Sequence, residues 1–149
     1  MTNLRRYRPI GGVTAAKLFP VSELDSVEDV AKGGGIEVEL LDDGSCYEEI
    51  ISAEQGLVSV RHTLTLCAQV DKAGEWMDAD FLQRCATEGV VACVGLASGE
   101  ELRLGWSPKF GFEQALRLDK LNFHSGDEPN TPPSLRLTLW SQDIESAVV

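Results

Sequence analysis

The residue types that most often do chemistry are sparse in this sequence and widely spaced. Its two histidines, His62 and His124, form neither an H-x-H nor an H-x-x-x-H pattern, so a zinc site would need ligands from distant segments. Neither a GxSxG nucleophile motif nor a glycine-rich phosphate loop occurs. The motifs therefore predict no catalytic residue, no metal site and no cofactor. We interpret His62 as a hydrogen-bonded histidine of the core or its rim.

The four cysteines are Cys46, Cys67, Cys85 and Cys93, and their spacing matches no CxxC or CxxxxC ligand pair. Each lies in an apolar stretch. Because free cysteine behaves as a small buried hydrophobe, we expect reduced thiols in the core. A disulfide and a reactive thiol are the alternatives.

A cluster of carboxylates fills residues 36–51, where no basic residue occurs. Its members are Glu37, Glu39, Asp42, Asp43, Glu48 and Glu49. Such a cluster could bind a divalent cation or a basic partner, or it could be a solvated outer face. Residues 42–44 lack the alternating oxygen ligands of a calcium loop, which favours the solvated face.

Charge is distributed unevenly along the chain, whose net charge is -11. The first 20 residues hold Arg5, Arg6, Arg8 and Lys17 and no acid, which leaves nine basic against 24 acidic residues in the remainder. An acidic body argues against general nucleic-acid binding, because phosphate contacts need a basic face. The basic arm and the acidic cluster could dock subunits head to tail. Alternatively, the arm is a disordered terminus.

The elements that must position these residues are mostly strands. Residues 36–41 alternate between polar and apolar, residues 42–45 have turn chemistry, and residues 46–51 can return, which predicts a hairpin. Residues 57–70 alternate for longer, with Val58, Val60 and Leu64 on the apolar face and His62 as its interruption. This pattern predicts an antiparallel sheet with one face on the core.

Other segments complete the expected fold. Residues 13–21 resemble an edge strand, residues 90–97 a central strand with its hairpin partner at 101–106, and one helix of about three turns begins near Asp78 and ends at Gly89. Residues 115–118 and 121–123 are expected to form another strand or a bulged pair, and residues 135–142 are expected to form the strand that closes the sheet. The fold class is mostly β, at the margin of α+β: an antiparallel sandwich or flattened barrel of roughly eight strands with one short helix.

Length and composition predict one folded domain. The chain has 149 residues, of which 43% are hydrophobic, and we divide it into a flexible basic arm at residues 1–12 and a β-rich domain at 13–149. Residues 90–97 form the longest apolar run, which is too short to span a bilayer. No apolar signal-peptide region follows the N-terminal arginines. We therefore expect a cytoplasmic protein without a membrane interaction.

The succession of residues 94–100 (VGLASGE), 105–107 (GWS) and 135–142 resembles small β proteins of bacterial prophage tail modules. The resemblance covers residues 36–142. It implies a structural or assembly role in a virion, in which β domains with an inserted helix form rings around the tail axis. It carries over no catalytic residue.

Three functions follow as hypotheses. The first is a non-enzymatic, self-associating structural or assembly protein, whose partners are copies of itself or other structural subunits. The second is a monomeric binding module in which Trp76, Trp106 and Trp140 line a groove for a peptide, a glycan or a small ligand. The third is an enzyme in which His62, His124 and the carboxylates converge only in the folded chain.

Overall fold

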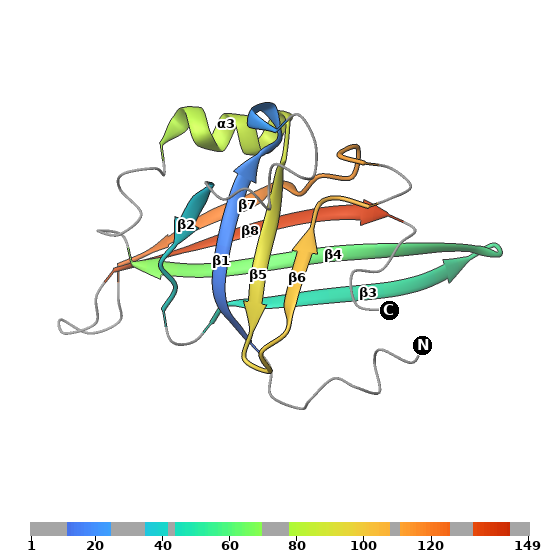
Figure 1. The fold of residues 1–149 in the computed structure, drawn as a ribbon, viewed down its shortest axis with the longest axis horizontal. Coiled ribbons are helices and arrows are strands. Elements are labelled where there is room, and N and C mark those ends of the chain that lie inside the picture. The colour runs from blue at the N-terminus through green and yellow to red at the C-terminus, as the bar shows by residue number, and fades with distance from the viewer. Residues whose placement is uncertain are drawn as a thin grey trace.

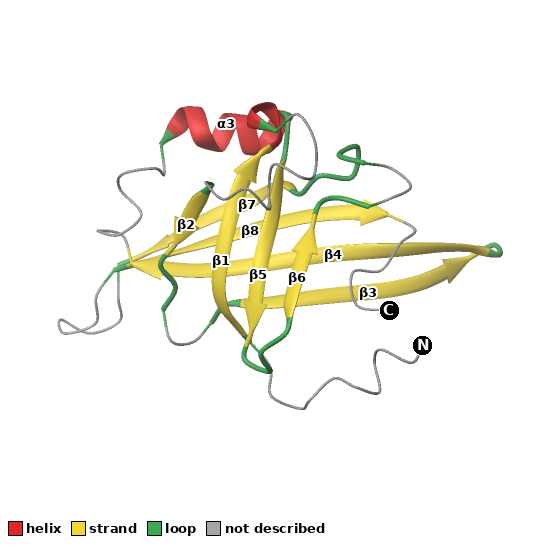
Figure 2. Cartoon of the chain, in the orientation of Figure 1, coloured by secondary structure: helices red, strands yellow, loops and turns green. Residues whose placement is uncertain are grey.

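Two antiparallel sheets of four strands and one α-helix make up the described part of the protein (Figures 1 and 2). The structure is a computed structural model, and it describes residues 12–24, 35–41, 44–69, 78–107, 111–125 and 133–143. The order of strands is β2-β1-β5-β6 in sheet A and β3-β4-β8-β7 in sheet B. The sheets do not close into a barrel, so the sandwich-like alternative among the predicted folds is confirmed.

The bounds of the elements agree well with most of the predicted segments. They are β1 (Val13–Pro20), the 3-10 helix η2 (Val21–Glu23), β2 (Ile36–Val38), β3 (Cys46–Glu54), β4 (Leu57–Gln69), α3 (Ala79–Thr87), β5 (Val90–Leu96), β6 (Glu101–Leu104), β7 (Arg117–His124) and β8 (Ser134–Asp143). Residues 115–118 and 121–123, predicted as another strand or a bulged pair, contribute to the single strand β7, whose register shifts between Leu118 and Lys120. The predicted basic arm lies outside the described residues, apart from Gly12.

The predicted hairpin of residues 36–51 is wrong. β2 pairs with β1, through Ile36 opposite Leu18, whereas β3 pairs with β4 and belongs to the other sheet. Polar turn residues such as those at 42–45 occur in connections between two sheets as well as in hairpins. The local sequence pattern could therefore not distinguish the two, and the hairpin was predicted wrongly. β1 is likewise an inner strand between β2 and β5, where an edge strand was expected.

The predicted helix is confirmed. The Asp78 side chain accepts a hydrogen bond of 2.8 Å from the backbone N–H of Phe81, which satisfies a donor that the first turn leaves unpaired. Phe81 and Cys85 form the buried stripe of α3. Gly89 follows the helix with a φ of 88°, where a Cβ atom would lie 2.7 Å from the Cβ of Ala115. Both backbone conformation and space therefore require glycine there.

The core lies between the two sheets and under α3. It is built from alternate residues of the strands together with the helix stripe. Its fully buried side chains include Leu18, Leu64, Leu66, Phe81, Val90, Leu104, Leu116, Leu137 and Leu139. A second, smaller cluster on the outer face of sheet A joins Phe19 and Val91 to Trp106 and Phe112.

The strands of sheet A run across those of sheet B (Figure 2). Strands advance about 3.3 Å per residue and lie about 4.8 Å apart, so the 13 residues of β4 extend about 43 Å, whereas the four strands of sheet A span about 15–20 Å. Sheet A can therefore cover only part of β3 and β4. The rest of this hairpin projects beyond the sandwich, as Figure 1 shows.

Candidate interaction surfaces

The projecting end of the β3–β4 hairpin, residues 50–59, is called the hairpin tip from here on. It carries four of the five large apolar side chains that are exposed in the described part of the chain. Their exposed fractions are 49% for Ile50, 45% for Ile51, 75% for Leu57 and 51% for Val58. The sequence placed Val58 on a core-facing side, and the structure shows why its exposure was missed: sheet A does not reach it.

A tight turn closes the hairpin tip. Glu54 pairs directly with Leu57, so that the loop consists of Gln55 and Gly56. Both have positive φ values, 52° and 80°, as the two-residue turn that suits twisted strands requires. Gln55 is the only residue other than glycine with a positive φ in the described segments. The tip is thus a defined β-structure with apolar residues on both of its faces.

A buried polar cluster of Tyr47, Glu49 and His62, called the Tyr47 cluster, lies next to the hairpin tip on the inner face of sheet B. The Tyr47 hydroxyl donates a hydrogen bond of 2.7 Å to Oε1 of Glu49 and lies 2.6 Å from Nδ1 of His62. Nδ1 and Oε1 are 3.4 Å apart, and the His62 and Glu49 side chains are 9% and 8% exposed. The prediction of a hydrogen-bonded histidine is confirmed. Along β3 and β4, the cluster lies between the buried apolar residues of the core and the hairpin tip.

The structure disperses the predicted carboxylate cluster. Glu37 and Glu39 are exposed on and after β2 of sheet A. Glu48 is exposed on the outer face of sheet B, and Glu49 is buried behind it. Asp42 and Asp43 lie outside the described residues, as do Arg5, Arg6 and Arg8. Among the four described carboxylates, the solvated interpretation therefore holds for three.

The tryptophans that the sequence singled out lie on different faces. Trp106 packs against Phe19 and Val91 on the outer face of sheet A. Trp140 lies on the outer face of sheet B, where the guanidinium carbon of Arg61 is 4.6 Å from its ring centroid. Trp76 lies outside the described residues. Trp106 and Trp140 therefore do not line one groove.

The outer face of sheet B is basic, although the chain as a whole is acidic. Direct pairing places Arg117 opposite Trp140, Lys120 opposite Thr138, and Arg136 opposite Cys67, and these pairs share the face that carries Arg61. The four cations Arg61, Arg117, Lys120 and Arg136 are all exposed and are called the basic face. The signal was present in the sequence, since Arg136 and Trp140 alternate with Leu135, Leu137 and Leu139.

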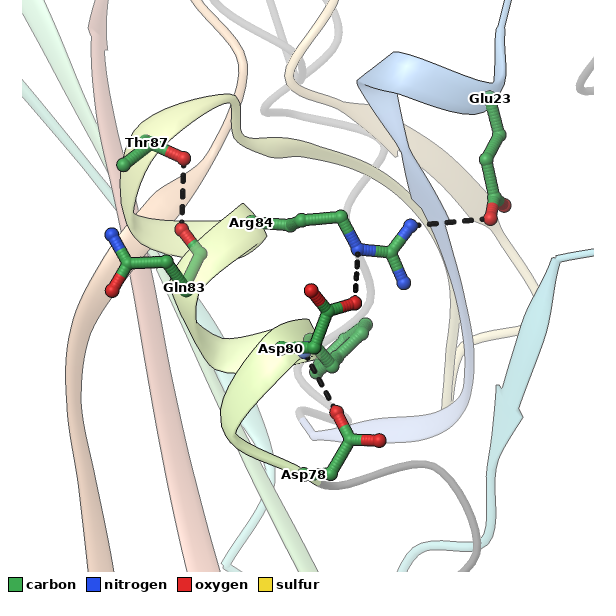
Figure 3. A network of polar contacts seen from close by, with 7 residues as sticks. Glu23, Asp78, Asp80, Gln83, Arg84 and Thr87 are labelled. Atoms are coloured by element: carbon green, nitrogen blue, oxygen red, sulfur yellow. Dashed lines mark hydrogen bonds and ion pairs between the residues drawn. The ribbon is translucent and has the colours of Figure 1, made fainter.

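The surface around α3 has the opposite charge, and Figure 3 shows the contacts that Arg84 makes on it. Arg84 bridges Glu23 of η2, at 3.2 Å, and Asp80 one helical turn earlier, at 3.3 Å. The hydrogen bond to Glu23 is the main reason why the pKa of Arg84 is raised. Asp78 and Glu88, at the two ends of the helix, are also exposed. Glu23, Asp78, Asp80 and Glu88, with Arg84 as their cation, are called the acidic helix surface.

The four cysteines are free thiols, as predicted, but not all of them are buried. Cys85 is buried under α3, and burial raises the pKa of its thiol to about 11. Cys67 is buried beneath the outer face of sheet B, and Cys93 is half-buried on the outer face of sheet A. Cys46 is exposed, which corrects the expectation for that residue. The strand alternation turns it outward, away from the core.

Among the described residues, two cavities lie along the sheets. One of about 590 Å³ is bordered by β1, β2 and β5, with Lys17, Glu37 and Glu101 among its lining residues. The other, of about 340 Å³, lies at the basic face next to Arg136 and His124. His124 is exposed there and does not join His62, with which the sequence had grouped it. Neither cavity is lined by the Tyr47 cluster.

The described segments hold neither a metal-binding cluster nor a membrane-spanning helix. In those segments, no three histidine, cysteine or acidic side chains come together in a way that could hold a metal ion. No helix in them has the length and hydropathy needed to cross a membrane. Comparison with protein-family models, curated proteins and solved structures gives no significant match for this chain.

Proposed function

We propose that this protein is a non-enzymatic structural or assembly protein that associates with copies of itself, and that the hairpin tip is one of its contacts. The observation that carries this proposal is the concentration of Ile50, Ile51, Leu57 and Val58 on one projecting element. Scattered apolar residues are normal on protein surfaces, whereas grouped ones mark interaction sites.

The shape of the tip supports a contact with another subunit. Burial of apolar area contributes about 25 cal/mol per Å², and the chain itself leaves 45% to 75% of each of these four residues exposed. The tight turn at Gln55 and Gly56 fixes the strands, so little conformational entropy is lost on docking. Few charges have to be desolvated, since Glu54 is the only ionised side chain in residues 50–59.

The biological setting we propose is a virion or tail component of prophage origin. Its support is the resemblance of residues 36–142 to prophage tail proteins, together with a β fold that contains one helix. In this setting the subunit folds in the cytoplasm and then joins rings or stacks. The buried Tyr47 cluster supports the non-enzymatic part of the proposal, because side chains that are 9% and 8% exposed leave little room for a substrate.

Light scattering after size exclusion tests this proposal with the full chain over a range of concentrations. We expect masses above the 16.2 kDa of the monomer, rising with concentration. The variant Ile51→Ser/Leu57→Ser should shift this equilibrium strongly towards the monomer. Phe123→Ser is the matched control, because Phe123 is a 63% exposed apolar residue outside the tip. A native chain that stays monomeric at every concentration overturns the proposal.

A further inference from the structure

The basic face is positively charged, whereas the chain as a whole has a net charge of -11. It holds four of the seven lysines and arginines in the described residues, and two exposed acids lie near them: Glu48, opposite Thr63, and Asp119, which precedes Lys120 on β7. Alternation along β4 and β8, together with the register shift between Leu118 and Lys120 on β7, turns these long side chains to the same side, and the inner side of the same strands forms the core. This concentration of positive charge is therefore fixed by the sheet and does not depend on loop conformation.

The basic face is continuous with the hairpin tip. Ile50 lies directly opposite Arg61, and Leu57 lies further along the same outer side of β4. A partner that contacts the basic face thus also meets apolar side chains at one end. The Trp140 ring faces the Arg61 guanidinium, so it is less available for stacking on a nucleic-acid base. These features favour a protein partner with an acidic surface.

The acidic helix surface of the same protein has the matching charge. Among its described residues, four carboxylates face one cation, Arg84, so these residues carry a net charge of opposite sign to that of the basic face. Asp80, Arg84 and Glu88 lie four residues apart and therefore share one side of α3. The Glu23 and Asp80 side chains are 61% and 81% exposed, which leaves their outer oxygens accessible although Arg84 bridges them.

We infer that the basic face of one copy docks on the acidic helix surface of a second copy. This inference rests on the proposed self-association and names its orientation. The two surfaces differ, so the contact is head to tail and leaves one surface of each kind unused at the ends of any open assembly. Repetition then gives a ring or a stack. Opposite charges set the approach and the register, while the apolar hairpin tip supplies area.

A charge-swap experiment tests the inference. The face variant Arg117→Glu/Lys120→Glu makes both surfaces acidic, and the helix variant Asp80→Lys/Glu88→Lys makes both basic. Each variant alone should associate at least about tenfold more weakly than the native chain, because like charges now face each other. An equimolar mixture should regain association, since each contact between the two variants again joins opposite charges. The readout is light scattering at low and at high salt.

Lys17→Glu/Arg103→Glu is the matched control. It changes the net charge as much as the face variant does, but on the outer face of sheet A, where both residues are exposed. This control should associate like the native chain. Circular dichroism melting of all variants establishes that they fold. If the face variant does not fold, Arg117→Gln/Lys120→Gln replaces it and should weaken association less.

The outcomes separate the two proposals. A native chain that is monomeric throughout overturns the proposed function and this inference together. A native chain that associates, with a face or helix variant that associates equally well, overturns the inference alone. Variants that weaken association but are not rescued by mixing also overturn it. A nucleic-acid result can also overturn the inference. This would be the case if the native chain bound a labelled oligonucleotide tightly and the face variant lost this binding but kept its self-association.

Discussion

The two halves of the β3–β4 hairpin have the same local structure and opposite surroundings. In the half that contains Leu64 and Leu66, alternate side chains are completely buried against sheet A. In the hairpin tip, the same two strands continue with the same alternation, yet Leu57 and Val58 are exposed. The difference teaches that a strand pattern determines which residues share a face, whereas the crossing sheet determines whether that face is covered.

The first way to test this comparison is to remove the same side chain from each half. Leu64→Ala removes a fully buried leucine and should lower the free energy of unfolding by about 2–5 kcal/mol, since a cavity remains in the core. Leu57→Ala should change it by less than about 0.5 kcal/mol, because Leu57 is 75% exposed. Urea unfolding of dilute, monomeric protein measures both. Similar losses at the two positions would contradict the division of the hairpin.

The second prediction compares a thiol of the covered core with one at the open start of β3. Burial raises the pKa of Cys85 to about 11, so its folded-state pKa lies above the unfolded value of about 8.5–9. The neutral thiol therefore stabilises the fold fully below about pH 8.5, and this contribution is lost as pH rises towards 11. The decline is at most about 1.4 kcal/mol per pH unit.

Thermal or urea unfolding between pH 8 and 10.5 measures this decline. Cys85→Ala should reduce the slope of stability against pH, although it also lowers stability at every pH. Cys46→Ala is the control, because it also removes one thiol but at an exposed position. Equal slopes for the native chain and Cys85→Ala would show that burial of this thiol does not drive the alkaline loss.

Much of the fold follows from sequence patterns that reflect local physics. The cap at Asp78, the stop at Gly89 and the long alternation of β4 each depend on neighbours in sequence, and all three were predicted. The partner of β3 and the inner position of β1 depend on which sheet each strand joins, and no local pattern contains that information. The exposure of Val58 depends on where sheet A crosses sheet B, and the placement of Arg117 and Arg136 on one face depends on the pairing of β7 with β8, so neither can be read from a local pattern.

The third prediction concerns the boundary between the two halves, where the Tyr47 cluster lies. His62→Ala removes the imidazole from the Tyr47 hydroxyl and the Glu49 carboxylate and should lower the free energy of unfolding by about 1–3 kcal/mol. Tyr47→Phe removes one hydroxyl and should lower it by about 1 kcal/mol. In a double-mutant cycle the two losses should overlap by more than about 0.5 kcal/mol. Strict additivity would show that the two side chains are not energetically coupled.

The smallest expected effect is at the turn of the hairpin tip. Gln55 has a φ of 52°, a conformation that asparagine adopts more readily than glutamine, and the two-residue turn favours Asn-Gly. Gln55→Asn should stabilise the tip by about 0.5 kcal/mol, and Gln55→Val should weaken it, because a β-branched residue is strained there. Since the tip makes few contacts with the core, it can open without global unfolding. We therefore expect slower amide hydrogen exchange in residues 51–58 of Gln55→Asn, by about twofold, with the global unfolding midpoint nearly unchanged. A shift of the unfolding midpoint without any change in exchange at the tip would mean that the tip and the sandwich unfold as one unit. The two halves of the β3–β4 hairpin would then differ in solvent exposure but not in local stability.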